Sequence, residues 1–195
     1  TEIQRRAYAD RAEHMGDPDF WDVPIDMLKS KEYAKKRIHD INMRKATPSK
    51  AVYAGNADIY ESPETTHYSV VDQWGNAVSV TTTINLSYGN GCVVEGAGFF
   101  LNNEMDDFSA KPGVPNAFGL VGNEANAISP DKRPLSSMTP TIVLKNNKPF
   151  LIVGSPGGST IITTTMQTIL NVIDHKMNIK EAVCAPRFHS QWLPD

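Results

Sequence analysis

A threonine pair, Thr65 and Thr66, opens a β-like run that ends at Asp72 and follows the turn-prone residues 62–64. A threonine hydroxyl becomes a nucleophile when the chain is cut just before it, because the freed α-amine can act as the base. Such an amine titrates at about 7.7–8.0, close to working pH. Threonine is also a common strand residue, so an ordinary strand is the alternative interpretation of the pair alone.

Five motifs follow this pair along the chain. They are DQWGNAVSVTTTIN (72–85), LNNEMDDF (101–108), KRPLSSMTPTIV (132–143), GSPGGS (154–159) and APRFH (185–189). In this order they closely resemble the gamma-glutamyltranspeptidases, over nearly the whole chain and most strongly from Thr65 onward. The resemblance implies an αββα sandwich of the N-terminal nucleophile hydrolase type. It also implies γ-glutamyl transfer and hydrolysis, on glutathione and other γ-glutamyl amides, through a threonine-bound ester.

The resemblance also implies the catalytic residues. Thr65 matches the nucleophile, and its hydroxyl is expected to cleave the chain by attacking the carbonyl of Glu64. Thr83 is expected to support Thr65 by hydrogen bonding, and Gly157 and Gly158 match the oxyanion positions. Without the resemblance, Thr83 would be one more polar strand residue, and the glycines would form a plain turn between a strand and a helix.

A γ-glutamyl group carries an α-ammonium and an α-carboxylate, so its pocket needs acceptors at one end and donors at the other. Asp107 and Glu104 match the family's ammonium acceptors, and Asn85 adds a neutral contact. Ser136 and Ser137 match the positions that donate hydroxyls to the carboxylate. The alternatives from the residues alone are a solvated acidic turn and an ordinary serine-containing loop.

The segment 111–120 resembles the loop that covers the substrate in many bacterial relatives. A tyrosine commonly occupies the position of Phe118 in that loop. Because phenylalanine has no hydroxyl, Phe118 cannot make the hydrogen bond to Asn85 that a tyrosine would make. The loop of this chain is therefore expected to lack that closing hydrogen bond, whereas the catalytic residues that it covers are unchanged.

Residues 1–64 are predicted to be mainly helical, with an exposed connector over 46–64 ahead of Thr65. An apolar stripe is predicted in the first helix, formed by Ile3, Ala7, Ala12 and Met15. The resemblance makes residues 1–64 the end of a large subunit. Residues 65–195 then form a small, catalytic subunit that lacks its C-terminal part, so the chain is interpreted as a fragment.

Beyond the connector, the apolar period of two predicts two hairpins. One pairs 68–72 with 77–84, and the other pairs 141–145 with 149–153 through a turn at Asn146-Asn147. A helix is predicted over 159–173, with a broad apolar face formed by Ile162, Met166, Ile169, Leu170 and Ile173. Asn178, followed by Glu181, predicts the cap of a further helix. Periodicity alone supports an α+β fold and not its layering.

The composition argues against several classes of protein and of binding site. The net charge of −3 argues against a nucleic-acid surface, and no apolar stretch reaches transmembrane length. Cys92 and Cys184 are expected to be unpaired small hydrophobes. The five histidines show no metal-ligand spacing, so neither a metal nor a cofactor is expected.

The expected partners are γ-glutamyl compounds such as glutathione, acceptor amino acids, peptides or water, and the remaining parts of both subunits. The resemblance implies a periplasmic or secreted protein. A related acylase that cuts glutaryl amides, or a poly-γ-glutamate processing enzyme, is the alternative enzyme. The ammonium acceptors Glu104 and Asp107 argue against a glutaryl substrate, which lacks that group. An inactive structural fragment is the alternative from another class.

Overall fold

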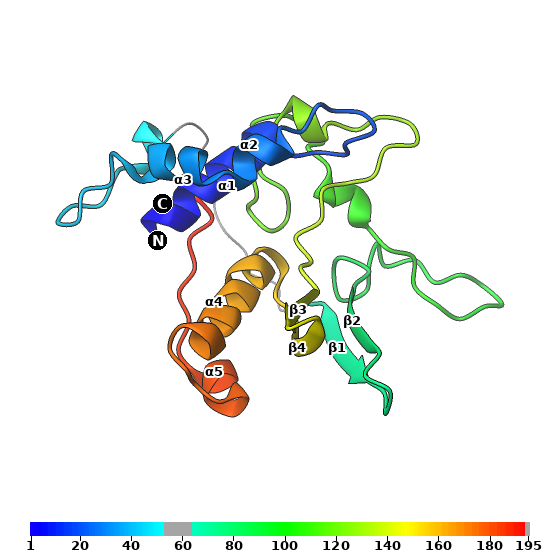
Figure 1. Cartoon of the computed structure of the whole chain (residues 1–195). Helices are drawn as coiled ribbons and strands as arrows, with labels where there is room; N and C mark the ends of the chain where they lie inside the picture. Colours follow the sequence, from blue (N-terminus) through cyan, green and yellow to red (C-terminus); the bar gives the residue numbers. More distant parts are fainter. Residues whose placement is uncertain (53–63, 194–195) are drawn as a thin grey trace. The chain divides into compact units, whose positions relative to one another are not determined.

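The computed structural model describes residues 1–52 and 64–193, which divide into two compact units (Figure 1). The first, called the helical unit, contains residues 1–52, 104–136 and 190–193. The second, called the hairpin unit, contains residues 64–103 and 137–189. Each unit is therefore built from segments that lie far apart in the sequence. Most of the predicted connector (53–63) lies outside the described residues.

Helices alternate with loops in the helical unit. It contains α1 (Glu2–His14), α2 (Ile25–Lys29), α3 (Lys31–Ile38) and the 3-10 turns η1 (Ser49–Ala51), η2 (Glu104–Asp107) and η3 (Glu124–Asn126). The hydroxyl of Ser30 caps α3 by accepting a hydrogen bond from the N–H of Tyr33 at 3.0 Å, which satisfies one backbone donor at the start of the helix.

Of the predicted apolar stripe of α1, only Ala12 is buried. Ile3 is 65% exposed and Met15 is 37% exposed, and Ala7 is exposed as well. The residues that α1 buries are Gln4, Arg6, Tyr8, Ala9 and Ala12. Arg6 can be buried because its guanidinium pairs with Glu2 at 2.7 Å and with Asp40 at 2.9 Å, which compensates the lost hydration. The buried face of this helix therefore combines a paired arginine with the core residues Tyr8, Ala9 and Ala12.

An ion pair in the helical unit fixes the loop after α1 to the segment before the two serines. The buried carboxylate of Asp17 accepts hydrogen bonds from the backbone N–H and the Nε of Arg133 at 2.9 and 3.0 Å. It accepts a third bond from Nη2 of Arg133 at 2.5 Å. These bonds hold the pKa of the Asp17 carboxyl well below its usual range. This contact is called the Asp17–Arg133 clamp.

Both predicted hairpins are present in the hairpin unit. Strand β1 (Thr66–Val71) pairs antiparallel with β2 (Ala77–Thr82), and β3 (Thr141–Lys145) pairs antiparallel with β4 (Lys148–Val153). The second turn uses Asn146 and Asn147 at φ of 53° and 59°. Asparagine tolerates this left-handed conformation, which two-residue hairpin turns require.

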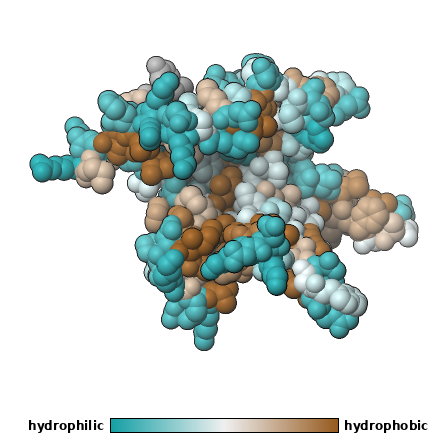
Figure 2. Space-filling view, viewed as in Figure 1, coloured by the Kyte–Doolittle hydropathy of each residue, from teal (hydrophilic) through white to brown (hydrophobic). Residues whose placement is uncertain are grey.

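The predicted helix over 159–173 is confirmed as α4 (Ile161–Ile173), which the 3-10 turn η4 (Gly158–Thr160) precedes. The predicted apolar face of Ile162, Met166, Ile169, Leu170 and Ile173 lies on one side of this helix, but it is largely uncovered, because Met166, Leu170 and Ile173 are 38%, 40% and 37% exposed. Figure 2 shows apolar surface over this helix. The residues that α4 buries are Ile161, Thr163, Thr165, Gln167 and Thr168.

The APRFH motif supplies hydrogen-bond partners for two residues of the buried polar face of α4. The side chain of Gln167 donates to the carbonyl of Phe188 at 2.8 Å and accepts from the N–H of Phe188 at 3.1 Å. The hydroxyl of Thr163 lies 2.8 Å from Nδ1 of His189. The last helix, α5 (Ile179–Cys184), starts with the predicted capping box of Asn178 and Glu181.

Cys92 and Cys184 are unpaired, as predicted, and both are exposed. Within residues 1–52 and 64–193, no helix is long and apolar enough to cross a lipid bilayer. The same residues contain no cluster of three or more His, Cys, Asp or Glu side chains suited to a metal ion.

Candidate active site

Thr65, the predicted nucleophile, lies immediately before β1 in the hairpin unit and is half-buried. The preceding Glu64 is half-buried too, and its Oε2 is fully enclosed with no hydrogen-bond partner among the described residues. In the continuous chain, the nitrogen of Thr65 is a peptide amide and cannot act as a base. Only cleavage of the Glu64–Thr65 bond would free it for that role.

Side chains of β1 contact the backbone of β4. The hydroxyl of Ser69 donates to the carbonyl of Ile152 at 3.3 Å. Two residues nearer the start of β1, the ring of His67 lies against Gly154, where a Cβ would stand only 2.3 Å from the imidazole. Burial lowers the pKa of His67, so the ring is neutral at pH 7. The two strands therefore run past each other in opposite directions.

Continued along both segments, these two contacts lead from Thr65, the predicted nucleophile, toward the glycine pair. Ser69 contacts Ile152, and His67, two residues earlier, contacts Gly154, two residues later. A further step of two from His67 reaches Thr65, and the matching step reaches Pro156, immediately before Gly157. We therefore expect Thr65 to face the start of the glycine turn.

Replacing Gly154 by alanine should destabilise this contact, because the added methyl group would overlap the imidazole of His67. The ring would have to move from its hydrogen bond with Thr81, in which Nδ1 lies 2.8 Å from the hydroxyl. We expect Gly154→Ala to lower the free energy of unfolding by roughly 1–3 kcal/mol, as overpacking does. Thermal unfolding of the full-length protein measures the effect.

The control is the same substitution in a His67→Ala background, where space is available for the methyl group. There Gly154→Ala should cost much less. An equal loss in both backgrounds would contradict the contact with His67.

The glycine turn (Gly157 and Gly158) connects β4 to η4 and α4. Both residues have positive φ, 125° and 51°, which glycine adopts without a steric penalty. The carbonyl of Gly157 accepts from the N–H and the hydroxyl of Thr160 at 2.9 and 2.7 Å. The first N–H groups of a helical segment lack acceptors within it. The turn can therefore offer N–H donors to an anionic oxygen.

Thr83 and Asn85 form a second fixed turn in the hairpin unit. The hydroxyl of Thr83 accepts from the N–H of Asn85 at 2.9 Å. Asn85 has a φ of 75° and is only 3% exposed, and its side-chain amide donates to the carbonyl of Asn103 at 3.2 Å. The structure thus joins Thr83 to Asn85, whereas the support of Thr65 by Thr83 stays a prediction. Ser137 also belongs to the hairpin unit.

The acidic turn η2 in the helical unit is not an ordinary solvated loop. Burial, followed by the charge of Glu104, raises the pKa of Asp107 to about 6, although the guanidinium of Arg11 opposes this shift. Burial also raises the pKa of Glu104. Burial disfavours the charged forms of both carboxyl groups, so a bound cation would stabilise these charged forms.

The neighbouring Asp106 has a different role, which the sequence did not indicate. Its carboxylate accepts from the N–H of Ala117 at 3.0 Å and so ties η2 to the predicted covering loop. Within that loop, Phe118 is only 7% exposed and its carbonyl accepts from the side chain of Gln191 at 3.1 Å. The role of Phe118 as a lid residue stays a prediction.

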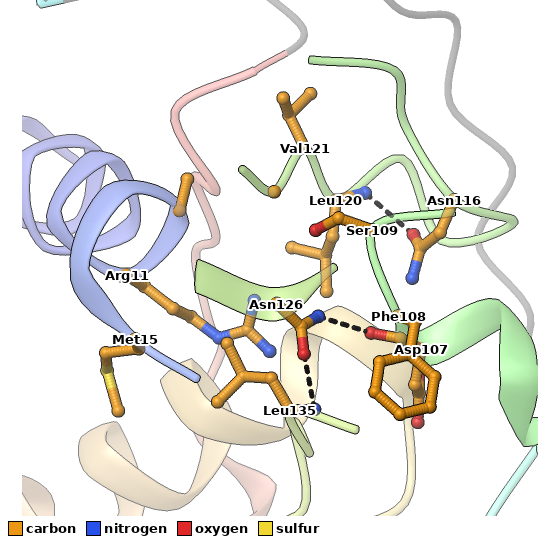
Figure 3. A pocket seen from close by; sticks show the side chains of 12 residues that line it. Arg11, Met15, Asp107, Phe108, Ser109, Asn116, Leu120, Val121, Asn126 and Leu135 are labelled. Carbon is orange, nitrogen blue, oxygen red and sulfur yellow. Dashed lines mark hydrogen bonds between the residues drawn. The ribbon is translucent and has the colours of Figure 1, made fainter. Parts of the chain in front are cut away.

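A small cavity lies behind the acidic turn (Figure 3). Arg11, Asp107, Ser109 and Asn126 contribute polar side chains to its wall. Its volume of about 10 Å³ leaves room for roughly one water molecule. The cavity is therefore too small for an amino acid, and its lining residues support the acidic turn from within.

The sequence model of the gamma-glutamyltranspeptidase family matches residues 1–195. The chain belongs to the gamma-glutamyltranspeptidase family. Among relatives of the family, the glutathione hydrolase proenzyme of Escherichia coli (strain K12) is 58% identical over 195 residues. The match covers 100% of this chain and 34% of that protein, so the chain spans about a third of the length of the curated relative.

The chain also resembles solved structures. A crystal structure of a Helicobacter pylori gamma-glutamyltranspeptidase mutant is 75% identical, with a TM-score of 0.65, over 67% of this chain and 70% of that chain. The cephalosporin acylase of Bacillus halodurans is 27% identical, with a TM-score of 0.71, over 94% of this chain and 30% of that chain. These likenesses confirm the predicted α+β fold of the N-terminal nucleophile hydrolase type.

The predicted site residues of this gamma-glutamyltranspeptidase chain fall into two sets. The helical unit contains Glu104, Asp107, Phe118 and Ser136, and the hairpin unit contains Glu64, Thr65, Thr83, Asn85, Ser137, Gly157 and Gly158. Sequence reasoning missed Arg11 and Asn126, which line the cavity beside Asp107. No motif contains either residue, and a single sequence offers no other signal for them.

Proposed function

We propose that the protein to which this chain belongs matures by self-cleavage and then hydrolyses or transfers γ-glutamyl groups. The observation that carries the proposal is the position of Thr65 at the start of β1, whose contacts with β4 lead toward the glycine turn. Family membership over residues 1–195 supports the same reaction class. In this proposal, residues 1–64 end the large subunit and residues 65–195 form most of the small subunit.

In the maturation step, the hydroxyl of Thr65 attacks the carbonyl carbon of Glu64. The C–N bond breaks, the nitrogen takes up the hydroxyl proton, and an ester joins the two residues. Water hydrolyses this ester, which leaves a carboxylate on Glu64 and a free amine on Thr65. The description of the Escherichia coli relative as a proenzyme supports such a step.

In turnover, the free amine of Thr65 accepts the hydroxyl proton while the oxygen attacks the γ-carbonyl of the substrate. The N–H groups of Gly157 and Gly158 stabilise the oxyanion, and Thr83 orients the nucleophile. The leaving amine departs with the proton. Water, or the amino group of an amino acid or peptide, then attacks the γ-glutamyl ester and regenerates the hydroxyl.

The α-amino acid end of the substrate determines specificity. Asp107 and Glu104 accept hydrogen bonds from the α-ammonium, and Asn85 adds a neutral contact. Ser136 and Ser137 donate to the α-carboxylate, and the loop of Phe118 covers the bound group. The substrates are glutathione and other γ-glutamyl amides, and the compartment is the periplasm or the exterior of the cell.

Binding of L-glutamate should weaken as the pH falls below about 6, because Asp107, with a pKa of about 6, loses the charge that attracts the α-ammonium. The inhibition constant, measured from pH 5 to 8, should rise on the acidic side. The Asp107→Asn variant should bind weakly without this inflection. Retention of the same inflection in that variant would assign it to another group.

Mass spectrometry of the purified full-length protein, combined with an assay on a γ-glutamyl anilide, tests the proposed function. We expect two polypeptides, one of which begins at Thr65, and release of the aniline. An intact chain with full turnover would refute the maturation step. The likeness to cephalosporin acylase makes an acylase the second candidate. Cleavage of a glutaryl anilide in preference to the γ-glutamyl compound would favour that candidate.

A further inference from the structure

One buried side chain links the acidic turn to the segment that leads into Ser136. The amide nitrogen of Asn126 donates to the carbonyl of Asp107 at 2.7 Å, and its oxygen accepts from the N–H of Leu135 at 3.0 Å (Figure 3). Asn126 is only 5% exposed. Both hydrogen bonds are therefore partly shielded from water, and loss of either one would leave a partly buried backbone group without this partner.

Arg11 of α1 makes a second link between the same two segments. Its guanidinium donates to the carbonyl of Ser136 through a long hydrogen bond of 3.4 Å. It lines the cavity together with Asp107 and Asn126, and its charge lowers the pKa of Asp107 against the effects of burial and of Glu104. Arg11 thus contacts one segment by hydrogen bonding and the other by charge.

From this geometry we propose that Arg11 and Asn126 are positioning residues that fix the separation between Asp107 and Ser136, the two ends of the amino-acid pocket. This inference rests on the proposed function, which assigns the α-ammonium to Asp107 and the α-carboxylate to Ser136. Neither Arg11 nor Asn126 is itself a catalytic residue. The pair is called the Arg11–Asn126 brace.

The chemical reason for such a brace is the fixed geometry of an α-amino acid. Its ammonium and carboxylate are attached to one carbon atom, so a pocket that binds both must hold its acceptors and donors at one separation. A pocket fixed in advance avoids the entropy of ordering those groups at each binding event. A shift of about 1 Å in either end can cost up to about a hundredfold in rate.

Three small inhibitors separate the two ends. L-glutamate carries both α groups, glutarate lacks the ammonium, and 4-aminobutyrate lacks the α-carboxylate. In the mature full-length protein, Asn126→Ala should raise the inhibition constant of L-glutamate about tenfold. It should change the constants of the other two by less than about twofold, because a ligand that uses one end does not sense the separation.

The matched control is Asn123→Ala, which makes the same chemical change near the same 3-10 turn. The side chain of Asn123 bonds to Glu13 at 2.7 Å, so its removal should leave all three inhibition constants unchanged. Equal weakening of all three inhibitors by Asn126→Ala would show a general structural role and overturn the brace. An unchanged constant for L-glutamate would overturn it as well.

Arg11 provides an independent test, including for the case in which Asn126→Ala does not fold. The charged groups that act on Asp107 are Glu104, Asp106 and Arg11. Arg11→Gln removes the positive charge, so the pH at which the inhibition constant of L-glutamate begins to rise should be higher in this variant. Arg11→Lys keeps the charge, so this pH should return to that of the unmodified protein. Identical pH profiles for both variants and the unmodified protein would refute the role of Arg11.

Failure of the brace is distinguishable from failure of the proposed function. If the unmodified protein neither binds L-glutamate nor cleaves a γ-glutamyl anilide, the proposed function fails and the brace fails with it. If the unmodified protein does both, and the variants of Arg11 and Asn126 still behave like it, only the brace fails.

Discussion

Thr65→Ala in the full-length protein should abolish both cleavage of the precursor and release of γ-glutamyl groups. In the proposed function one hydroxyl serves as the nucleophile in both reactions, and alanine has no atom that can replace it. We expect a single uncleaved polypeptide by mass spectrometry and no aniline release above background. No other single substitution in the chain is expected to remove both activities so completely.

Two further variants control this experiment. Thr65→Ser keeps a hydroxyl and should retain part of both activities. Thr66→Ala removes the neighbouring hydroxyl, on the first residue of β1, and should still mature. Full maturation of Thr65→Ala would instead place the nucleophile elsewhere, with Thr66 as the first residue to test.

Asp107→Ala should have the second largest effect, a loss of about 10- to 150-fold in kcat/KM on γ-glutamyl anilides. This range corresponds to one charge-assisted hydrogen bond of about 1.5–3 kcal/mol. A glutaryl anilide, which has no ammonium, should lose far less. Glu104→Gln should be milder than Asp107→Ala, because glutamine keeps an acceptor oxygen.

The comparison between the two anilides decides the role of Asp107. Equal losses of kcat/KM on both substrates would show that Asp107 supports the fold or the loop and does not anchor the ammonium. Thermal unfolding of Asp107→Ala provides the accompanying check. Since burial penalises its carboxylate, we expect no loss of stability at neutral pH.

The sequence predicted the locally determined features of the fold well. The turn at Asn146 and Asn147, the capping box of Asn178 and Glu181 and the period-two pattern of the strands all depend on residues a few positions apart. Such features are set by backbone preference and short-range hydrogen bonds. They were therefore visible without any knowledge of the tertiary structure.

The buried faces of α1 and α4 were not predictable in the same way. Arg6 is buried because Asp40 lies beside it, and Gln167 because Phe188 does. Arg11 lies 125 positions from Ser136, to which it donates. The sequence of one helix does not show such distant partners, so the prediction assigned the buried face to the apolar side chains instead.

The resemblance supplied the candidate catalytic and substrate-binding residues, because they lie within recognisable motifs. It did not supply Asn126, which lies outside them and acts on backbone groups. Backbone groups are the same at every residue, so the sequence carries no trace of which one an asparagine will bind. The structure was needed to find these bonds.

We expect the Asp17–Arg133 clamp to persist in the mild acid that protonates Asp107. Its aspartate has a lowered pKa, so the stability that it contributes is complete above the ordinary aspartate pKa and is lost only when the pH falls through the lowered value. Asp107 instead takes up its proton at a pH of about 6, and protonation of a group with a raised pKa favours the folded state. In the proposed function, mild acid should therefore weaken binding of the α-ammonium while the segment before Ser136 stays clamped, and we expect neutralisation to restore activity without refolding.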